Sequence, residues 1–146
     1  MLHQFFLECT WNGGRNSTGE IKTGALQSTI SIPKEMNGPG EGTNPDEMLL
    51  GAAATCFVIT YAAMLERAHI EKASLTLSSE AKVDVSKQVF TFKEIIHRPV
   101  LTIINEHDRA QALKLAYAAE QSCMISKALH GNVTITVEPS INEQKM

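Results

Sequence analysis

The N-terminal third of the chain shows the alternation of apolar and polar residues that is typical of half-buried β-strands. The alternation is clearest over 25–32, and an apolar stretch over 3–11 predicts an earlier strand. Residues 17–24 form either a short strand or a loop. The run of prolines and glycines over 33–45 excludes a helix there, because both residue types disfavour helix interiors.

The pattern changes after Asn44, where a long helix is predicted over 45–68. Asn44 can cap this helix, and Pro45 suits its first position. The segment Met48–Leu65 carries no charge and is apolar on two neighbouring faces, so the helix is expected to be covered on more than one side. The length of this uncharged segment is at the lower edge of a membrane span. However, acidic residues flank it, so it lacks the excess of flanking Lys and Arg that is typical of the cytoplasmic end of a membrane helix. A buried central helix is therefore the favoured interpretation.

The second half of the chain returns to alternation. Two stretches, 73–85 and 89–104, predict a pair of long strands, the second broken or ended near Pro99. Two helices are expected next, over 108–119 and 122–129. A last strand over 132–138 and a loose polar tail from 139 onward complete the chain. The order of strands, helix, strands, helices and strand predicts an α+β fold with largely antiparallel sheets.

Composition narrows the class of protein. A length of 146 residues favours one domain over 1–146, and 43% hydrophobic with 20% charged residues is typical of a soluble globular protein. The net charge of −3 argues against nucleic-acid binding. Three cysteines are too few for a secreted disulfide framework, and no signal peptide is evident, so a cytoplasmic location is expected. The five histidines lack metal-binding spacing, so no metal site is predicted.

Two cysteines set deep in apolar sequence are the strongest candidates for chemistry. Cys56 lies in the predicted long helix and Cys123 far along the chain, so they form no local CxxC motif. If the fold brings them together, they can act as a nucleophile and its resolving partner. A thiol in apolar surroundings has a raised pKa unless a cation lies beside it. Arg15, on a glycine turn, is the candidate cation, and Asp46 is the candidate carboxylate that orients its guanidinium.

Each of these residues also has a structural interpretation. Cysteine is often simply buried, a loop arginine is usually solvated, and Asp46 is adequately explained as a first-turn acid that serves the helix dipole. The third cysteine, Cys9, lies in a predicted strand and matches no motif.

The sequence resembles the family of osmotically inducible protein C and the organic hydroperoxide resistance protein (OsmC/Ohr). The matching stretches occur in the order and spacing of that family and span most of the chain: Gly13–Arg15, Gly42–Leu49, Ala54–Phe57, Cys123–Leu129 and Gly131–Asn132. Each stretch alone is weak, and together they are highly specific.

The resemblance implies a thiol-dependent peroxidase that reduces organic hydroperoxides to alcohols and is built as an intertwined homodimer. By that resemblance Cys56 is the peroxidatic cysteine and Cys123 the resolving one, which form a redox-active disulfide. Arg15 then matches the arginine that activates the thiolate, and Asp46 the carboxylate that orients it. No cofactor is implied beyond an external dithiol reductant, which for the Ohr branch is a lipoylated protein.

Two departures from the family pattern leave alternatives open. The family usually has Glu where Asp46 stands, so the partner of Arg15 is either Asp46 or the neighbouring Glu47. The family usually has Pro after its second cysteine, where this chain has Met124. The alternative functions are a redox sensor or small-molecule-binding stress protein on the same fold, and a structural dimer whose cysteines are inert.

Overall fold

The computed structural model describes residues 1–145 and divides the chain into two units, Met1–Met48 and Leu49 onward. Both units combine helical segments with sheets, and most of the paired residues are antiparallel. This confirms the predicted α+β class. That the whole chain behaves as a single domain stays a prediction.

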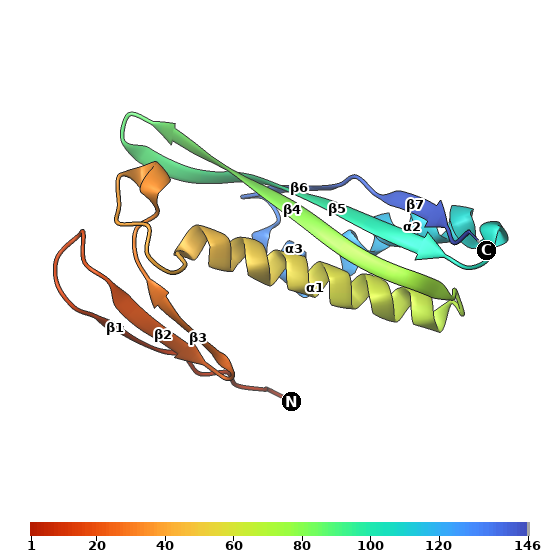
Figure 1. Ribbon diagram of the computed structural model, residues 1–146, viewed down its shortest axis with the longest axis horizontal. Coiled ribbons are helices and arrows are strands. Elements are labelled where there is room, and N and C mark those ends of the chain that lie inside the picture. Colours follow the sequence, from red (N-terminus) through yellow and green to blue (C-terminus); the bar gives the residue numbers. More distant parts are fainter. Residues whose placement is uncertain (146) are drawn as a thin grey trace. The chain divides into compact units, whose positions relative to one another are not determined.

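The N-terminal unit is built on a three-stranded antiparallel sheet in the order β1-β2-β3 (Figure 1). Its strands are β1 (Glu8–Trp11), β2 (Gly19–Thr23) and β3 (Leu26–Ile30). The first strand is shorter than the predicted 3–11, and a 3₁₀ turn, η1 (Lys34–Met36), lies in the proline- and glycine-rich loop.

This loop returns to the sheet at Gly42. The backbone there has a φ of +67°, and a Cβ atom would lie 1.9 Å from the carbonyl oxygen of Thr29. Only glycine accommodates both the left-handed conformation and the close approach. The N–H of Thr43 then bonds the same carbonyl at 2.8 Å, which sets the direction in which the chain enters the following helix.

The long helix α1 (Pro45–Arg67) begins where the sequence predicts. The backbone N–H of Glu47 donates to the side-chain oxygen of Asn44 at 2.9 Å, as in an N-cap. One stripe of the helix is buried, formed by Ala53, Phe57, Tyr61 and Leu65. Other apolar side chains, such as Ile59 at 68% exposure, lie outside that stripe. Cover on a second side of the helix therefore stays a prediction.

Within residues 1–145, α1 is the one helix that is long and apolar enough to cross a membrane by length and composition. A core helix of a soluble protein passes the same test, so this property alone decides nothing.

The C-terminal unit is dominated by a long antiparallel hairpin of β4 (Lys72–Ser86) and β5 (Val89–Ile103) (Figure 1). It continues through a 3₁₀ turn, two helices and two short strands: η2 (Glu106–Asp108), α2 (Arg109–Ser122), α3 (Met124–Leu129), β6 (Thr134–Val137) and β7 (Ser140–Glu143). Both short strands pair with β5 in parallel.

The prediction that the second long strand breaks near Pro99 is wrong, because β5 runs through it. The carbonyls of His97 and Ile103 accept hydrogen bonds from the β6–β7 side, and alternate residues of a strand direct their backbone groups to the same neighbour. Pro99 therefore faces that side too. It falls between the residues that pair with β6 and those that pair with β7, where a missing N–H breaks no ladder.

The prediction of a loose tail after Pro139 is also wrong for part of its length. Residues Ser140–Glu143 form β7, in register with Val100–Ile103 of β5. The side chain of Ile141 packs against the main core cluster. Burial of this one apolar side chain in an otherwise polar segment stabilises the pairing of β7 with β5.

The hydrophobic core of the C-terminal unit joins α1, β5 and α2. Its buried members include Phe57, Tyr61, Leu65, Ile70, Leu101, Ile103, Ala112, Ala116 and Ala119. The small alanines of α2 let that helix approach α1 closely. The hydroxyl of Tyr61 donates to the carbonyl of Ala112 at 2.8 Å, which fixes the two helices to each other at one buried point.

Candidate functional site

The structure brings together two cysteines that lie in distant parts of the sequence. Cys56 is on the middle of α1, and Cys123 is the residue between α2 and α3. Both are free thiols, and their side chains share a hydrogen bond. Two neighbouring free thiols of this kind are the components of a dithiol that can close to a disulfide.

Cys56 is held by the packing of its helix neighbours. Phe57 is fully buried, and its ring stacks on that of His97 in β5 with centroids 4.8 Å apart. Tyr61, one turn further on, is anchored to α2 by its hydroxyl. Cys56 itself lies beside this buried stripe and is half-buried. The thiol is thus fixed in position while part of it stays open to the surroundings.

Cys123 is held by the backbone on both of its sides. Its N–H donates to the carbonyl of Ala119 at 3.0 Å, at the end of α2, and its carbonyl accepts from Lys127 at 3.0 Å, at the start of α3. Between these bonds the residue is extended, with φ −63° and ψ 126°. Its side chain is fully buried. The turn between two helices therefore delivers this thiol to the interior.

The surroundings lower the pKa of Cys56. Burial acts in the opposite direction and raises it, but several hydrogen bonds outweigh that effect. They come from the Cys123 thiol, the backbone N–H groups of Ile125 and Met124, and the Thr60 hydroxyl. Each favours the thiolate, since a negative sulfur is the better acceptor. The net result is a sulfur that ionises more readily than a free thiol.

The pKa of Cys123 moves the other way. Burial raises it, and the hydrogen bond with Cys56 raises it further, because Cys123 must keep its proton to donate it. Contacts with Ser126 and with the backbone N–H of Ile125 offset only part of this. Ionisation is thus easier at Cys56, and harder at Cys123, than in an ordinary thiol.

Arg15 lies in the turn after β1, in the N-terminal unit, whereas Cys56 belongs to the C-terminal unit. Its guanidinium is exposed and donates to the side chain of Asn16 at 2.7 Å and to the carbonyls of Met36 and Asn37 at 2.9 and 3.3 Å. These bonds hold the side chain against the η1 loop. That Arg15 activates the thiolate stays a prediction.

Asp46 is half-buried in the first turn of α1. Within residues 1–145 no ion pair joins Arg15 to Asp46 or to Glu47. The carboxylate of Glu47 instead accepts from the Thr43 hydroxyl at 2.9 Å. Which acid orients the arginine stays open.

The part of the chain that the structure describes holds no cluster of three or more His, Cys, Asp or Glu side chains suited to a metal ion. Cys9 is exposed on β1. The chemistry of the site is therefore built from the thiol pair and the polar groups around it.

Sequence reasoning missed the groups that tune the two sulfurs. Thr60 lies one helical turn after Cys56, and this spacing was available as a signal. The backbone N–H donors of Met124 and Ile125 could not be recognised from the types of side chain in the sequence. Glu120 and Ser126 flank Cys123 at three residues on either side, a spacing that places them within a turn of it.

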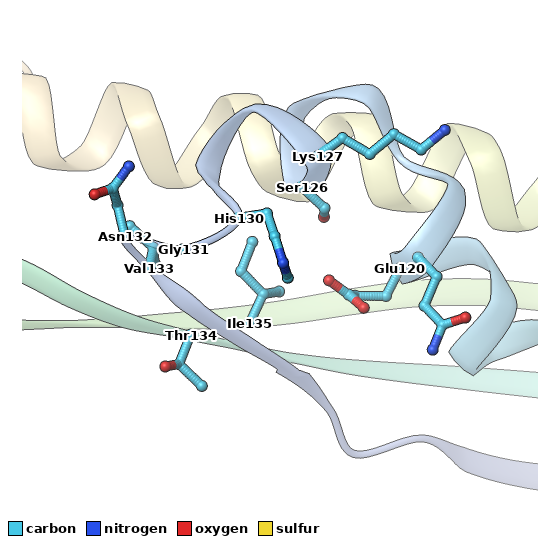
Figure 2. Close-up of a pocket in the computed structure, with 10 residues that line it drawn as sticks. Glu120, Ser126, Lys127, His130, Gly131, Asn132, Val133, Thr134 and Ile135 are labelled. Atoms are coloured by element: carbon cyan, nitrogen blue, oxygen red, sulfur yellow. The ribbon is translucent and has the colours of Figure 1, made fainter.

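Glu120 and Ser126 also line an open pocket of about 680 Å³ (Figure 2). The figure shows the side chains of Glu120, Ser126 and His130 turned toward one another at its wall. Lys127 reaches away from this group. The pocket is polar, and it belongs to α2, α3 and the start of β6.

A comparison with protein families matches residues 38–138 to the OsmC-like protein family. The matched segment contains both Cys56 and Cys123. It covers more than half of the chain.

Related proteins extend the similarity over nearly the whole length. The chain is 56% identical over 144 residues to the uncharacterized protein YmaD of Bacillus subtilis strain 168, covering 95% of each. It is 28% identical over 131 residues to the organic hydroperoxide resistance protein of Xanthomonas axonopodis pv. citri, covering 88% of this chain and 89% of that one. The crystal structure of an organic hydroperoxide resistance protein OsmC from Legionella pneumophila shares the fold, with a TM-score of 0.76 at 24% identity over 96% of this chain and 98% of the other.

Proposed function

The chain belongs to the OsmC-like family, and from this membership and the paired thiols we propose that it is a thiol-dependent peroxidase that reduces organic hydroperoxides to alcohols. Relatives named for organic hydroperoxide resistance support a role in peroxide resistance or redox chemistry. The finer assignment depends on the chemistry of Cys56 and Cys123.

The observation that carries the proposal is the opposite direction of the two pKa changes. Cys56 has its pKa lowered by four hydrogen-bond donors, and its neighbour Cys123 has its pKa raised. A two-step thiol peroxidase needs this asymmetry, because one sulfur must attack first as a thiolate while the other waits as a thiol. The contact between the two sulfurs accounts for part of this asymmetry, and the Met124 N–H and Thr60 hydroxyl, which act on Cys56 alone, add to it.

In the first step the Cys56 thiolate attacks the terminal oxygen of the hydroperoxide. The O–O bond breaks, the alkoxide takes a proton and leaves as the alcohol, and Cys56 becomes a sulfenic acid. The sulfur is oxidised by two electrons and the peroxide is reduced by two. The N–H groups of Met124 and Ile125 favour the ionised form of the sulfur before the attack.

In the second step Cys123 attacks the sulfur of the Cys56 sulfenic acid. A disulfide forms and the hydroxyl group leaves as water. An external dithiol then reduces the disulfide by exchange and restores both thiols. Closure of the disulfide protects Cys56 from further, irreversible oxidation.

Arg15 and Asp46 complete the proposed machinery. The guanidinium would add a positive charge that favours the thiolate, and a carboxylate, Asp46 or Glu47, would orient it. The hydrogen bonds of Arg15 to the η1 loop support a fixed rather than a mobile side chain.

The substrate class follows from the apolar surroundings of Cys56. The side chain of Met124, whose N–H bonds the thiol, is 72% exposed. Ile59, less than one turn of α1 away from Cys56, is 68% exposed. Apolar surface of this kind favours the alkyl or aryl part of an organic hydroperoxide over hydrogen peroxide.

The assembly and the cellular setting are part of the proposal. A second copy of the chain would cover the exposed apolar side of α1 and form an intertwined homodimer. The reductant would be an external dithiol, for which a lipoylated protein is the candidate. The cytoplasm, which keeps thiols reduced, is the location that suits this chemistry.

A turnover assay tests the proposal. The purified protein is mixed with cumene hydroperoxide and dihydrolipoamide, and the loss of peroxide is followed, with hydrogen peroxide as the competing substrate. We expect many equivalents of cumene hydroperoxide to be consumed per chain, faster than hydrogen peroxide, and a Cys56–Cys123 disulfide in the mass spectrum.

Two results would contradict the proposal. Consumption of one equivalent or less per chain with dithiol in excess would favour a redox sensor. No reaction at all, with a Cys56 pKa above that of a free thiol, would favour a structural role for both cysteines. A Cys9→Ser variant serves as the control, because Cys9 lies outside the pair.

A further inference from the structure

The resolving step raises a problem that the thiol pair alone does not solve. Cys123 is fully buried and protonated, and a thiol is a poor nucleophile until it loses its proton. Its donor bond runs to Cys56, which becomes oxidised in the first step and can no longer accept a proton as a thiolate. The proton must therefore leave by another route.

Ser126 lies on the side of Cys123 where such a route can begin. It follows Cys123 by one helical turn, is 6% exposed, and contacts the Cys123 sulfur closely enough to affect its pKa. Its hydroxyl has no hydrogen-bond partner of good geometry among residues 1–145. A buried hydroxyl without a partner is unfavourable, which calls for a functional explanation or a bound water.

Glu120 lies at the other end of the route. Its carboxylate is half-buried at the wall of the polar pocket and lies near the Ser126 hydroxyl, as Figure 2 shows. Burial raises the pKa of Glu120, and contacts with Ser126 and His130 offset part of that effect. A carboxylate with a raised pKa is a better proton acceptor near neutral pH than an ordinary one. The pocket then gives the proton a way to solvent.

We propose that Glu120 accepts the proton of Cys123 through the hydroxyl of Ser126 and so activates the resolving thiol. The inference rests on the proposed peroxidase function and deepens it. Ser126 passes its own proton to the Glu120 carboxylate and takes the proton of Cys123. The Cys123 sulfur then forms a bond to the sulfur of Cys56 and displaces hydroxide. The hydroxide takes a proton from solvent and leaves as water, and Glu120 returns one proton to solvent through the pocket, so the step balances.

The relay of Cys123, Ser126 and Glu120 predicts a defect confined to one step. Glu120→Gln keeps the shape of the side chain but cannot accept a proton at neutral pH. We expect it to leave the reaction of Cys56 with cumene hydroperoxide unchanged and to slow disulfide closure at pH 7 by roughly 10²-fold, the lower end of general-base effects. Single-turnover mixing with thiol quenching and mass spectrometry separates the two rates.

The pH profile separates proton transfer from a structural effect. At high pH hydroxide deprotonates Cys123 directly, so the rate of closure in Glu120→Gln should approach that of the wild type. The other charged or titratable groups at the pocket are Lys127 and His130, both exposed. Glu120→Asp keeps a carboxylate with a shorter reach and should close faster than Glu120→Gln. A defect independent of pH, or equal in Asp and Gln variants, would overturn the relay.

Two controls sharpen the assignment. Glu66→Gln makes the same change on the exposed end of α1 and should close at the wild-type rate. Ser126→Ala should match the Glu120→Gln defect, since it removes the middle of the relay. Closure at the wild-type rate in Ser126→Ala with slow closure in Glu120→Gln would overturn the route through Ser126.

The relay can be tested apart from peroxide chemistry. Diamide reacts with the Cys56 thiolate to form an adduct that Cys123 resolves to the same disulfide, so closure can be timed without a hydroperoxide. If the wild type forms the disulfide with diamide but does not react with cumene hydroperoxide, the proposed peroxidase function is contradicted. Equal closure rates of wild type and Glu120→Gln after diamide would overturn the relay, whatever the peroxide assay gives.

Discussion

Cys56 and Cys123 share a hydrogen bond, yet the two regions that hold them differ in almost every respect. Cys56 lies within a continuous helix and is half-buried, while Cys123 lies in the break between two helices and is fully buried. Backbone N–H groups act on both sulfurs, but the Thr60 hydroxyl and the Met124 N–H act on the first alone, and Ser126 on the second alone. The pKa is lowered at one and raised at the other.

The contrast shows how one chain can assign different roles to identical side chains. Burial acts on both thiols in the same direction, so it cannot distinguish them. The distinction comes from the contact between the two sulfurs, in which Cys123 is the donor, and from the Met124 N–H and the Thr60 hydroxyl, which act on Cys56 alone. The break between these helices thus activates a residue that lies on another element.

The largest expected effects come from replacing each cysteine in turn with serine, which exchanges its sulfur for oxygen. Cys56→Ser should abolish peroxide reduction, because the sulfur that reacts first is gone. Cys123→Ser should still consume about one equivalent of hydroperoxide and accumulate a sulfenic acid that dimedone labels. The measurement is intact-mass spectrometry after stoichiometric cumene hydroperoxide. Equal behaviour of the two variants would contradict the assigned order.

Acid should lower the stability of the fold through His97, a buried residue packed against the neighbour of Cys56. Burial lowers the pKa of His97, which stacks on Phe57, to about 4. The unfolded chain binds this proton near pH 6.5, so unfolding takes up a proton between pH 6.5 and 4, and stability falls as the pH falls through that window. The loss should reach about 2–3 kcal/mol at pH 4, measured by urea unfolding.

The matched control for this prediction is His97→Gln. Glutamine does not titrate and can keep a hydrogen bond to Ser79, which lies 2.7 Å from the ring nitrogen of His97. The variant should show a flatter dependence of stability on pH over the same window. An unchanged slope would place the acid sensitivity elsewhere.

The next test removes one backbone donor. Met124 occupies the first position of α3, and the residue before it is extended, so proline fits there without strain. Met124→Pro deletes the N–H that bonds Cys56 and should raise the pKa of that thiol. Alkylation of Cys56 by iodoacetamide should slow about tenfold at pH 6, since a bond to a charged group contributes about 1.5–3 kcal/mol.

Met124→Ala is the control, because it changes the side chain and keeps the N–H. Its alkylation profile should follow that of the wild type, while the profile of Met124→Pro moves to higher pH. If both variants shifted equally, the apolar side chain rather than the backbone donor would control the thiol.

The smallest expected effect concerns the side-chain donor. Thr60→Val removes the hydroxyl that bonds Cys56 and should raise the pKa of the thiol less than Met124→Pro does, since one weaker contact of several is lost. A few-fold slower alkylation at pH 6 is expected. Thr55→Val is the matched control on the same helix, because its hydroxyl donates to Gly51 instead. An effect of Thr55→Val as large as that of Thr60→Val would remove the special role of Thr60.

Much of the fold could be predicted because its signals are local. Asn44 and Pro45 mark the start of α1, and the alternation over 73–85 and 89–104 predicts the two strands of the long hairpin. Pro99 misled the prediction, because its tolerance depends on a gap between two strands that follow much later in the chain. Parallel pairing of β6 and β7 with β5 is a long-range event that no local pattern contains.

The candidate site also has a part that the sequence could predict and a part that it could not. The two cysteines could be identified from the sequence, and the family resemblance gave them roles that stay predictions. The backbone donors at Met124 and Ile125 could not be identified, because every residue except proline has an N–H and only the fold directs it. The family usually has proline, which has no N–H, at the position of Met124, so the departure from the pattern adds a backbone donor in this chain.

The backbone bonds on either side of Cys123 have a consequence for how oxidation is sensed. Both its N–H and its carbonyl are engaged in helix ends, so the main chain at this point resists displacement. Formation of the disulfide must then be accommodated by rotation about side-chain bonds, chiefly those of Cys56. The oxidised and reduced forms should have almost superimposable backbones, and a partner that tells them apart must recognise the small surface around Cys56 rather than a change of shape.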